Sequence, residues 1–293
     1  MNARISKRDV RIYLLVALLW SSCFAASGHA GDTVTWAYFS YPPLFILENE
    51  KDPTGFGFDI TNLAISAMPE YRHVVRKIPI KRFIQQMKTG KNCICAYGMI
   101  KTPDREKWAF FSHPCRIIMP RMIVIRKDDL TKFGGGSAVS LSRLIKNEKL
   151  TLLLKKGTRY GARIDKILNE SSGLDNISYL YSDELGRQAL KMLMARRGDY
   201  FLSLSSTIYD AEKLGYADDI ALIPIEDETY ITGCVACSKN ERGRRVIEKV
   251  NSMLRKEISS GKIYQILSSR VPDMMRREFK REYEVLLIEP LKQ

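Results

Sequence analysis

Short apolar runs alternate with amphipathic stretches along most of the chain. Apolar runs bounded by turn residues predict buried strands at 34–39, 73–80, 93–97, 116–126, 150–154, 177–181, 220–225 and 230–238. Apolar positions at helical spacing predict helices at 57–68, 81–87, 141–147, 162–169, 183–196 and 240–259. Strands that alternate with helices in this way are typical of α/β proteins. A length of 293 residues allows one large domain or two modest ones.

The stretch from Gly90 to Arg105 carries the clearest candidate chemistry. Its buried strand is followed by a turn in which Thr102 is a helix-capping type and Pro103 suits the first helical position. Arg105 therefore lies in the first turn of a short helix, at the carboxyl end of a strand, where open α/β sheets bind ligands. An arginine there can hold a carboxylate or similar oxyanion. A surface arginine without function is the simpler interpretation of this stretch alone.

The N-terminus has the organisation of a secretory signal peptide. A basic segment precedes the apolar run 12–20, which is too short to span a bilayer, and small residues follow up to Ala30. We expect residues 1–30 to be removed and the mature protein to be periplasmic. An uncleaved anchor is the alternative, and Cys23 is a candidate lipidation site with a poor lipobox before it.

The chain is basic, with a formal net charge of +14. Loss of the four Lys/Arg residues and one Asp of the signal peptide leaves +11. The basic residues are dispersed and the protein is expected to be exported, which argues against nucleic acid as a partner. We interpret them as a solvated surface that favours anionic partners. Contact with the membrane is expected only through the signal peptide.

Five cysteines remain in the mature chain: Cys93, Cys95, Cys115, Cys234 and Cys237. Export favours disulfides, and the odd number leaves at least one thiol unpaired in a monomer. Cys234 and Cys237 lie in one predicted strand, about 10 Å apart, so they are not expected to bridge each other. A bridge from Cys115 to Cys93 or Cys95 is open, and most of the five suit small buried apolar positions.

No metal or other cofactor is expected. The mature chain has two histidines, His73 and His113, and neither lies at ligand spacing from another candidate.

Several stretches together resemble the family 3 extracellular solute-binding proteins, the amino-acid-type periplasmic receptors of ABC importers. The matching segments are Tyr41-Pro42-Pro43, Gly57-Phe58-Asp59, 90–105 with Phe111-Ser112-His113-Pro114, Lys156 to Gly161, 198–203 and 261–266. The resemblance implies an α/β, two-lobed type 2 periplasmic-binding-protein fold, each lobe a mixed sheet flanked by helices. The first lobe comprises 31–121 and 231–293, and the second comprises 122–230. The lobes would close on a ligand by bending at the two crossovers.

The resemblance also implies a ligand site. Arg105 would hold the anionic end of the ligand, Gly157 and Thr158 would add amide and hydroxyl donors, and Tyr41 would stack on the body of the ligand. Positions near them complete the candidate site: Tyr97, Gly98, Ile100 and Ser203.

Two positions depart from the family pattern for gripping an ammonium group. Ile100 replaces a Ser or Thr, and the region Ser203-Leu204-Ser205 lacks the family's Asp. A buried ammonium without an acceptor costs several kcal/mol. We therefore expect a small anionic or polar ligand that is not a standard α-amino acid. Tyr97, at a position that is usually small, would narrow the pocket.

The favoured function is a monomeric receptor without catalysis, with an ABC permease or a sensor kinase as its partner. An exported enzyme similar to cyclohexadienyl dehydratases is one alternative, and a sensory module that feeds no importer is another. The sequence offers no clear general acid or base, because Asp59 and Asp199 match structural positions of the family and His113 is expected in a turn. The C-terminal tail from Met274 is expected to pack on the first lobe, with a membrane-surface helix as the alternative.

Overall fold

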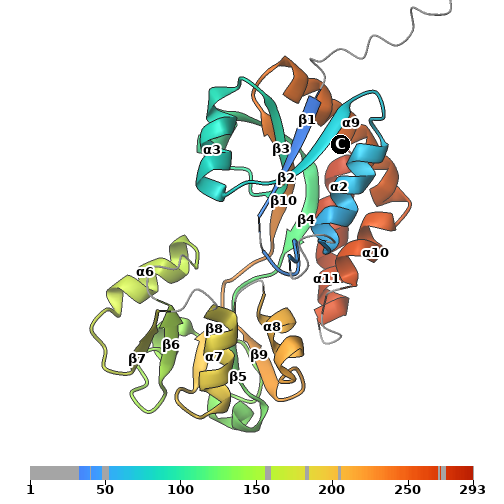
Figure 1. Ribbon diagram of the computed structural model, residues 1–293. Helices are drawn as coiled ribbons and strands as arrows, with labels where there is room; N and C mark the ends of the chain where they lie inside the picture. The colour runs from blue at the N-terminus through green and yellow to red at the C-terminus, as the bar shows by residue number, and fades with distance from the viewer. Residues whose placement is uncertain are drawn as a thin grey trace, which may run out of the picture.

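The computed structural model describes residues 33–39, 41–47, 53–155, 160–181, 185–203, 206–269, 271 and 275–292. It contains two five-stranded sheets, each with helices on both faces (Figure 1). We call each sheet with its helices a lobe. Figure 1 shows the two lobes one above the other, joined by chain segments that run side by side. The predicted two-lobed α/β fold is thus confirmed.

The sheet of the first lobe has the strand order β2-β1-β3-β10-β4. Its strands are β1 (Thr33–Tyr38), β2 (Arg72–Lys77), β3 (Cys93–Met99), β4 (Ala109–Ile118) and β10 (Ile231–Ser238). β1 pairs in parallel with β2 and β3, whereas β10 is antiparallel to both β3 and β4. The helices of this lobe are α2 (Phe56–Ser66), α3 (Ile80–Thr89), α4 (Pro103–Glu106), α9 (Glu241–Ser259) and α10 (Lys262–Ser268).

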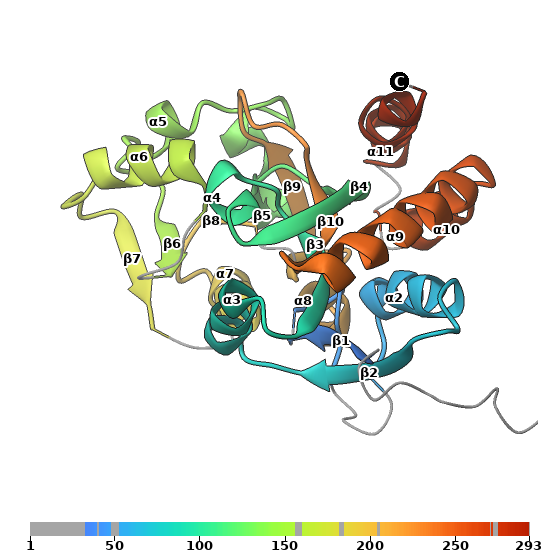
Figure 2. The same ribbon diagram turned by 90° about the horizontal axis from the view of Figure 1, so that it is seen from above.

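Alternation along β3 explains how this sheet is covered on two sides. Cys93, Cys95 and Tyr97 belong to the core cluster beneath α2 and α9, while Ile94 and Ala96 pack with Phe83 and Met87 of α3. Figure 2 shows α3 on one side of the strands, with α2, α9 and α10 on the other. Because both faces are covered, the strand is apolar at almost every position.

The sheet of the second lobe has the order β7-β6-β8-β5-β9. Its strands are β5 (Met122–Arg126), β6 (Leu152–Lys155), β7 (Ile177–Leu180), β8 (Tyr200–Leu202) and β9 (Ile220–Pro224). Its helices are the 3-10 helix η1 (Lys127–Phe133), α5 (Leu141–Leu144), α6 (Ala162–Glu170), α7 (Leu185–Met194) and α8 (Thr207–Leu214). Two crossovers join the lobes: 119–121 between β4 and β5, and 225–230 between β9 and β10.

The structure corrects the expected elements at several places. The strand predicted at 116–126 is two strands, separated by Met119-Pro120-Arg121, because Pro120 has no N–H to continue a ladder. His113 lies within β4 and not in a turn, and its backbone N–H donates to Asn251 Oδ1 at 2.8 Å. The helices η1 and α8 were not predicted.

The C-terminal tail packs on the first lobe, as expected. It forms α11 (Arg276–Tyr283), the π-helical turn η3 (Glu284–Ile288) and the 3-10 turn η4 (Glu289–Leu291). Phe279, Tyr283 and Leu287 are buried, and the Tyr264 ring of α10 contacts both the Phe279 and the Tyr283 rings. Among the described residues, no helix is long and apolar enough to cross a membrane.

One disulfide joins the centre of the first sheet. Cys95 of β3 and Cys237 of β10 are directly paired, with their Cα atoms 4.1 Å apart. The bridges considered from Cys115 to Cys93 or Cys95 were therefore wrong, because β10 and not β4 lies beside β3. Cys93, Cys115 and Cys234 are buried free thiols, and burial raises the pKa of Cys93 and of Cys234 to about 11.

This pairing predicts a large effect of the Cys95–Cys237 bridge on stability. The bridge closes a loop with a sequence separation of 142 residues, so replacing both cysteines by alanine should lower the free energy of unfolding by about 2–5 kcal/mol. Urea denaturation followed by circular dichroism measures this loss. Cys93→Ala, two residues away on the same strand and unbridged, is the matched control and should cost less. Equal losses in the two variants would contradict the assigned pairing.

Candidate functional site

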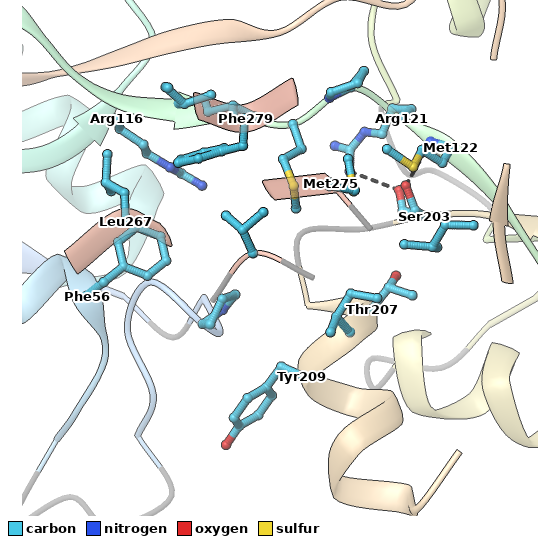
Figure 3. A pocket seen from close by; sticks show the side chains of 18 of the residues that line it. Phe56, Arg116, Arg121, Met122, Ser203, Thr207, Tyr209, Leu267, Met275 and Phe279 are labelled. Carbon is cyan, nitrogen blue, oxygen red and sulfur yellow. Dashed lines mark hydrogen bonds between the residues drawn. The ribbon is translucent and has the colours of Figure 1, made fainter. Parts of the chain in front are cut away.

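A pocket lies where the two lobes meet, and we call it the interlobe pocket (Figure 3). The first lobe lines it with Pro43 and with residues of α2, β4, α10 and the C-terminal tail. The 119–121 crossover and second-lobe residues from β5, α8, β9 and Ser203 after β8 complete the lining. It encloses about 1010 Å³ of empty space, including open solvent. In Figure 3, Arg116, Phe56, Leu267 and Phe279 lie on one side, and Arg121, Met122, Ser203 and Thr207 on the other.

Arg116 reaches this pocket because two glycines leave room for it in the first sheet. Arg116 of β4 is paired with Gly233 of β10, and the next strand, β3, carries Gly98. Arg116 Nη1 donates to the Gly98 carbonyl oxygen at 3.3 Å. A Cβ at Gly98, where φ is +82°, would lie 3.0 Å from Nη1, and a Cβ at Gly233 would lie 3.0 Å from the Gly98 carbonyl oxygen. Side chains at either position would displace the guanidinium or its acceptor.

Tyr41 forms a second contact of this guanidinium. The Arg116 Cζ atom lies 5.7 Å from the centroid of the Tyr41 ring, within the range of a cation–π interaction. Two backbone hydrogen bonds of 3.0 Å between Tyr41 and Phe45 close the loop that holds the ring. Tyr41 is 36% exposed, so its ring is only partly covered by the protein.

The charge of Arg116 has no carboxylate partner among the residues that the structure describes. Its side chain is buried, with 7% exposed, and its buried Nε–H has no hydrogen-bond acceptor within the described part of the chain. Its guanidinium, which offers five N–H donors, has the Gly98 carbonyl as its hydrogen-bond acceptor and the Tyr41 ring as its other contact. Unpaired buried cations are costly and are common at functional sites.

Arg126 shows what a structural buried arginine looks like in the same molecule. It is 5% exposed, and it donates to the carboxylates of Asp129 and Asp199. Its Nη1 also donates to the carbonyl oxygens of Leu193 and Gly198 at 2.7 and 2.6 Å. Asp199 in turn accepts from the Thr151 N–H at 2.8 Å, so it supports the second lobe and does not face the pocket.

Arg121 and Ser203 form the second-lobe side of the pocket. Arg121 Nη1 donates to the Ser203 carbonyl oxygen at 3.0 Å, and Ser203 Oγ accepts from the Met122 N–H at 2.9 Å (Figure 3). These bonds tie the crossover to the end of β8. Glu212 is the one carboxylate among the described lining residues, and it is exposed.

Three of the eight residues predicted for the site gather at this pocket. Ser203 lines it, and Tyr41 and Gly98 contact Arg116. Tyr97 is fully buried in the core of the first lobe and does not line the pocket. Its hydroxyl donates to the Cys115 carbonyl oxygen at 3.1 Å. Burial raises the pKa of Tyr97, so this phenol stays neutral.

Arg105 occupies the local structure that its sequence predicts, but it does not line this pocket. The Thr102 side chain caps α4 by accepting from the Arg105 N–H at 3.3 Å, and Pro103 is the first helical residue. Arg105 as a residue is half-buried, and its Nη1 donates to the Ile100 carbonyl oxygen at 2.7 Å in an exposed hydrogen bond. Ile100 is exposed. Gly157 and Thr158 lie outside the described residues.

Sequence reasoning missed Arg116 and Arg121. The available signal was a pair of arginines that flank the apolar run 117–120 at a predicted crossover. Neither arginine matches a family motif. Burial of Arg116 also depends on Gly98 and Gly233, which are distant from it in the sequence.

The described residues of the pocket show no pair suited to acid–base catalysis. His113 lies outside it, where burial and the nearby Arg255 lower the pKa of its imidazole. No group of three or more metal-ligating side chains occurs among the described residues.

Solved structures share this fold. A probable amino-acid ABC transporter extracellular-binding protein from Bacillus subtilis matches with a TM-score of 0.63 and 17% identity, over 82% of this chain and 98% of that one. An ancestral cationic amino acid solute binding protein matches with a TM-score of 0.61 and 17% identity, over 81% and 95%. An ancestral amino acid-binding protein described as a precursor of cyclohexadienyl dehydratase matches with a TM-score of 0.55 and 18% identity, over 80% and 93%. At such identities the likeness shows the fold.

A search of curated proteins gave no match. The family model of the bacterial extracellular solute-binding proteins, family 3, matches residues 36–269, which span both lobes. This match covers most of the chain and includes the strands that build the pocket. The chain therefore belongs to family 3 of the bacterial extracellular solute-binding proteins.

Proposed function

We propose that this protein is an exported receptor that captures a small anionic ligand between its two lobes and delivers it to an ABC importer. Membership of an extracellular solute-binding family supports the class of function. The observation that carries the choice of ligand is Arg116, a buried guanidinium that lines the interlobe pocket and has no carboxylate partner in the described part of the chain. The signal peptide at 1–30 and a periplasmic location belong to the same proposal.

A carboxylate in the pocket would give Arg116 the partner that the described protein lacks. Charge-assisted hydrogen bonds from a guanidinium are strong in a partly desolvated site, and they would offset the cost of burying the cation. Arg121 also lines the pocket and has no carboxylate contact among the described residues, so the pocket carries a second positive charge. Arg105 remains a candidate for a second contact with the ligand when the lobes close.

The pocket offers little to an ammonium group. Ile100, which is exposed and does not line the pocket, has an apolar side chain where the family pattern has a hydroxyl. Ser203, which lines the pocket, already uses its Oγ and its carbonyl oxygen in hydrogen bonds. Glu212, the described lining carboxylate, is exposed and therefore screened by water. We infer that the ligand is not an α-amino acid.

Receptor function without catalysis is also part of the proposal. An enzyme on the same fold is the alternative, since one solved relative is described as a precursor of cyclohexadienyl dehydratase. Turnover of prephenate-like acids by the purified protein would favour the enzyme. Binding of acids without turnover would favour the receptor.

The unpaired charge predicts an unusual stability effect at Arg116. Arg116→Met should leave the free energy of unfolding of the free protein unchanged or raise it by about 1–4 kcal/mol, because a desolvated cation is replaced by an apolar side chain of similar length. Arg126→Met is the matched control. It should lower that free energy by about 3–5 kcal/mol, because it leaves the carboxylates of Asp129 and Asp199 without their cationic partner. Urea denaturation measures both. A loss above 1 kcal/mol in Arg116→Met would mean that this arginine is structural.

Ligand binding gives the direct test. Mono- and dicarboxylates should raise the melting temperature of the mature protein in a thermal-shift screen, while the corresponding amides should not. A ligand at a hundred times its dissociation constant adds about 2.7 kcal/mol of stability. Arg116→Ala should weaken binding by about 30-fold or more in isothermal titration calorimetry, as expected when a charge-assisted contact worth about 2 kcal/mol is lost.

Two further variants complete this experiment. Arg245→Ala removes one exposed positive charge of α9, away from the pocket, and should leave the affinity within about twofold. Arg105→Ala reports whether the second arginine also touches the ligand. Stabilisation by amino acids or sugars, with no response to carboxylates, would reject the proposed ligand class.

A further inference from the structure

The C-terminal tail supplies a wall of the interlobe pocket. Val271, Met275 and Phe279 line it together with Leu267 of α10. The family model matches residues 36–269, so these three residues lie beyond the matched part of the chain. The wall is thus a feature of this chain that the family match does not cover.

Packing against α10 of the first lobe fixes the position of this wall. Phe279 is 2% exposed, and its ring centroid lies 6.4 Å from that of Tyr264 in α10. One turn further on, the rings of Tyr283 and Tyr264 meet edge to face at 5.1 Å. Leu287 is fully buried. The apolar side chains of α11 are therefore placed before any ligand arrives.

The pocket combines this apolar wall with the buried Arg116 guanidinium, which has no carboxylate partner among the described residues. In Figure 3, Phe279 and Leu267 lie on the same side as Arg116, and Met275 lies between that side and Arg121. Phe56 and Met122 add further carbon surface. Hydroxyl or ammonium groups on the body of a ligand would face carbon atoms there and would lose hydrogen bonds to water. A hydrocarbon body would lose none.

We propose that the ligand is an amphiphilic monocarboxylate, an aliphatic or aromatic acid without an amino group. Its carboxylate contacts Arg116, and its hydrocarbon body lies against Met275 and Phe279. The tail residues Val271, Met275 and Phe279 then select for the apolar body. This inference rests on the proposed function and adds the ligand class and the residues that select it.

A chain-length series tests the inference. Isothermal titration calorimetry of the mature protein with acetate, butyrate, hexanoate and octanoate should show affinity rising about fourfold for each methylene added, until the pocket is full. Alcohols and amines of the same chain lengths should bind at least tenfold more weakly than the acids, because they cannot satisfy the guanidinium. Gluconate and succinate serve as polar acids of similar size, and both should bind more weakly than hexanoate.

Variants in the tail test which residues contact the hydrocarbon body of the ligand. Phe279→Leu and Met275→Ala should weaken hexanoate binding by about tenfold and should leave acetate binding within about twofold. Leu287→Ala is the matched control, because this residue is also buried in the C-terminal tail but does not line the pocket. It should lower the melting temperature without changing the dependence of affinity on chain length. Melting curves confirm that each variant is folded at the temperature of the titration.

The outcomes separate this inference from the proposed function. Tighter binding of gluconate or succinate than of hexanoate, unaffected by Phe279→Leu, would overturn the inference and leave the anion receptor intact. Affinity that does not rise with chain length would also overturn it. If a neutral or cationic solute binds and no acid does, both proposals fail.

Discussion

The return of β10 to the first sheet is the constraint on which the rest of this structure depends. After the chain has passed through the second lobe, its strand β10 returns to the first sheet and lies between β3 and β4, antiparallel to both. This insertion creates the second crossover, so the lobes are joined by two segments side by side. It also brings Cys237 onto Cys95 and aligns Gly233 with Arg116.

The same insertion explains how a cation can be buried beside an apolar pocket. Gly233 lets β10 approach the Gly98 carbonyl closely, and Gly98 leaves space for the guanidinium. Arg116 and Arg126 have nearly equal burial, yet their surroundings differ. Arg126 is neutralised by two carboxylates and ties η1 and β8 to β5, as expected of a structural ion pair. Arg116 has a carbonyl and an aromatic ring, which leave most of its charge for a further partner.

The C-terminal tail links this pocket to both crossovers. Met275 and Phe279 lie beside the first crossover, where they line the pocket with Met119 and Arg121. At the second crossover, burial and the nearby carboxylate of Glu278 in α11 raise the pKa of Tyr230. A ligand that binds between the lobes would therefore touch a segment that also contacts the hinge. Hinge closure around a ligand is the common motion of two-lobed receptors.

The amino-acid sequence by itself determined the local features of this protein. Apolar periodicity located most helices and strands, and the Thr102 cap with Pro103 placed Arg105 correctly in α4, because such features depend on neighbours within a few residues. The family motifs then indicated two lobes. Only the tertiary structure decided that Cys95 pairs with Cys237, that Arg116 is a buried cation without a carboxylate partner among the described residues, and that the tail lines the pocket. Each of these rests on contacts between residues that are distant in the chain, and their energies depend on burial, which no local pattern of residues specifies.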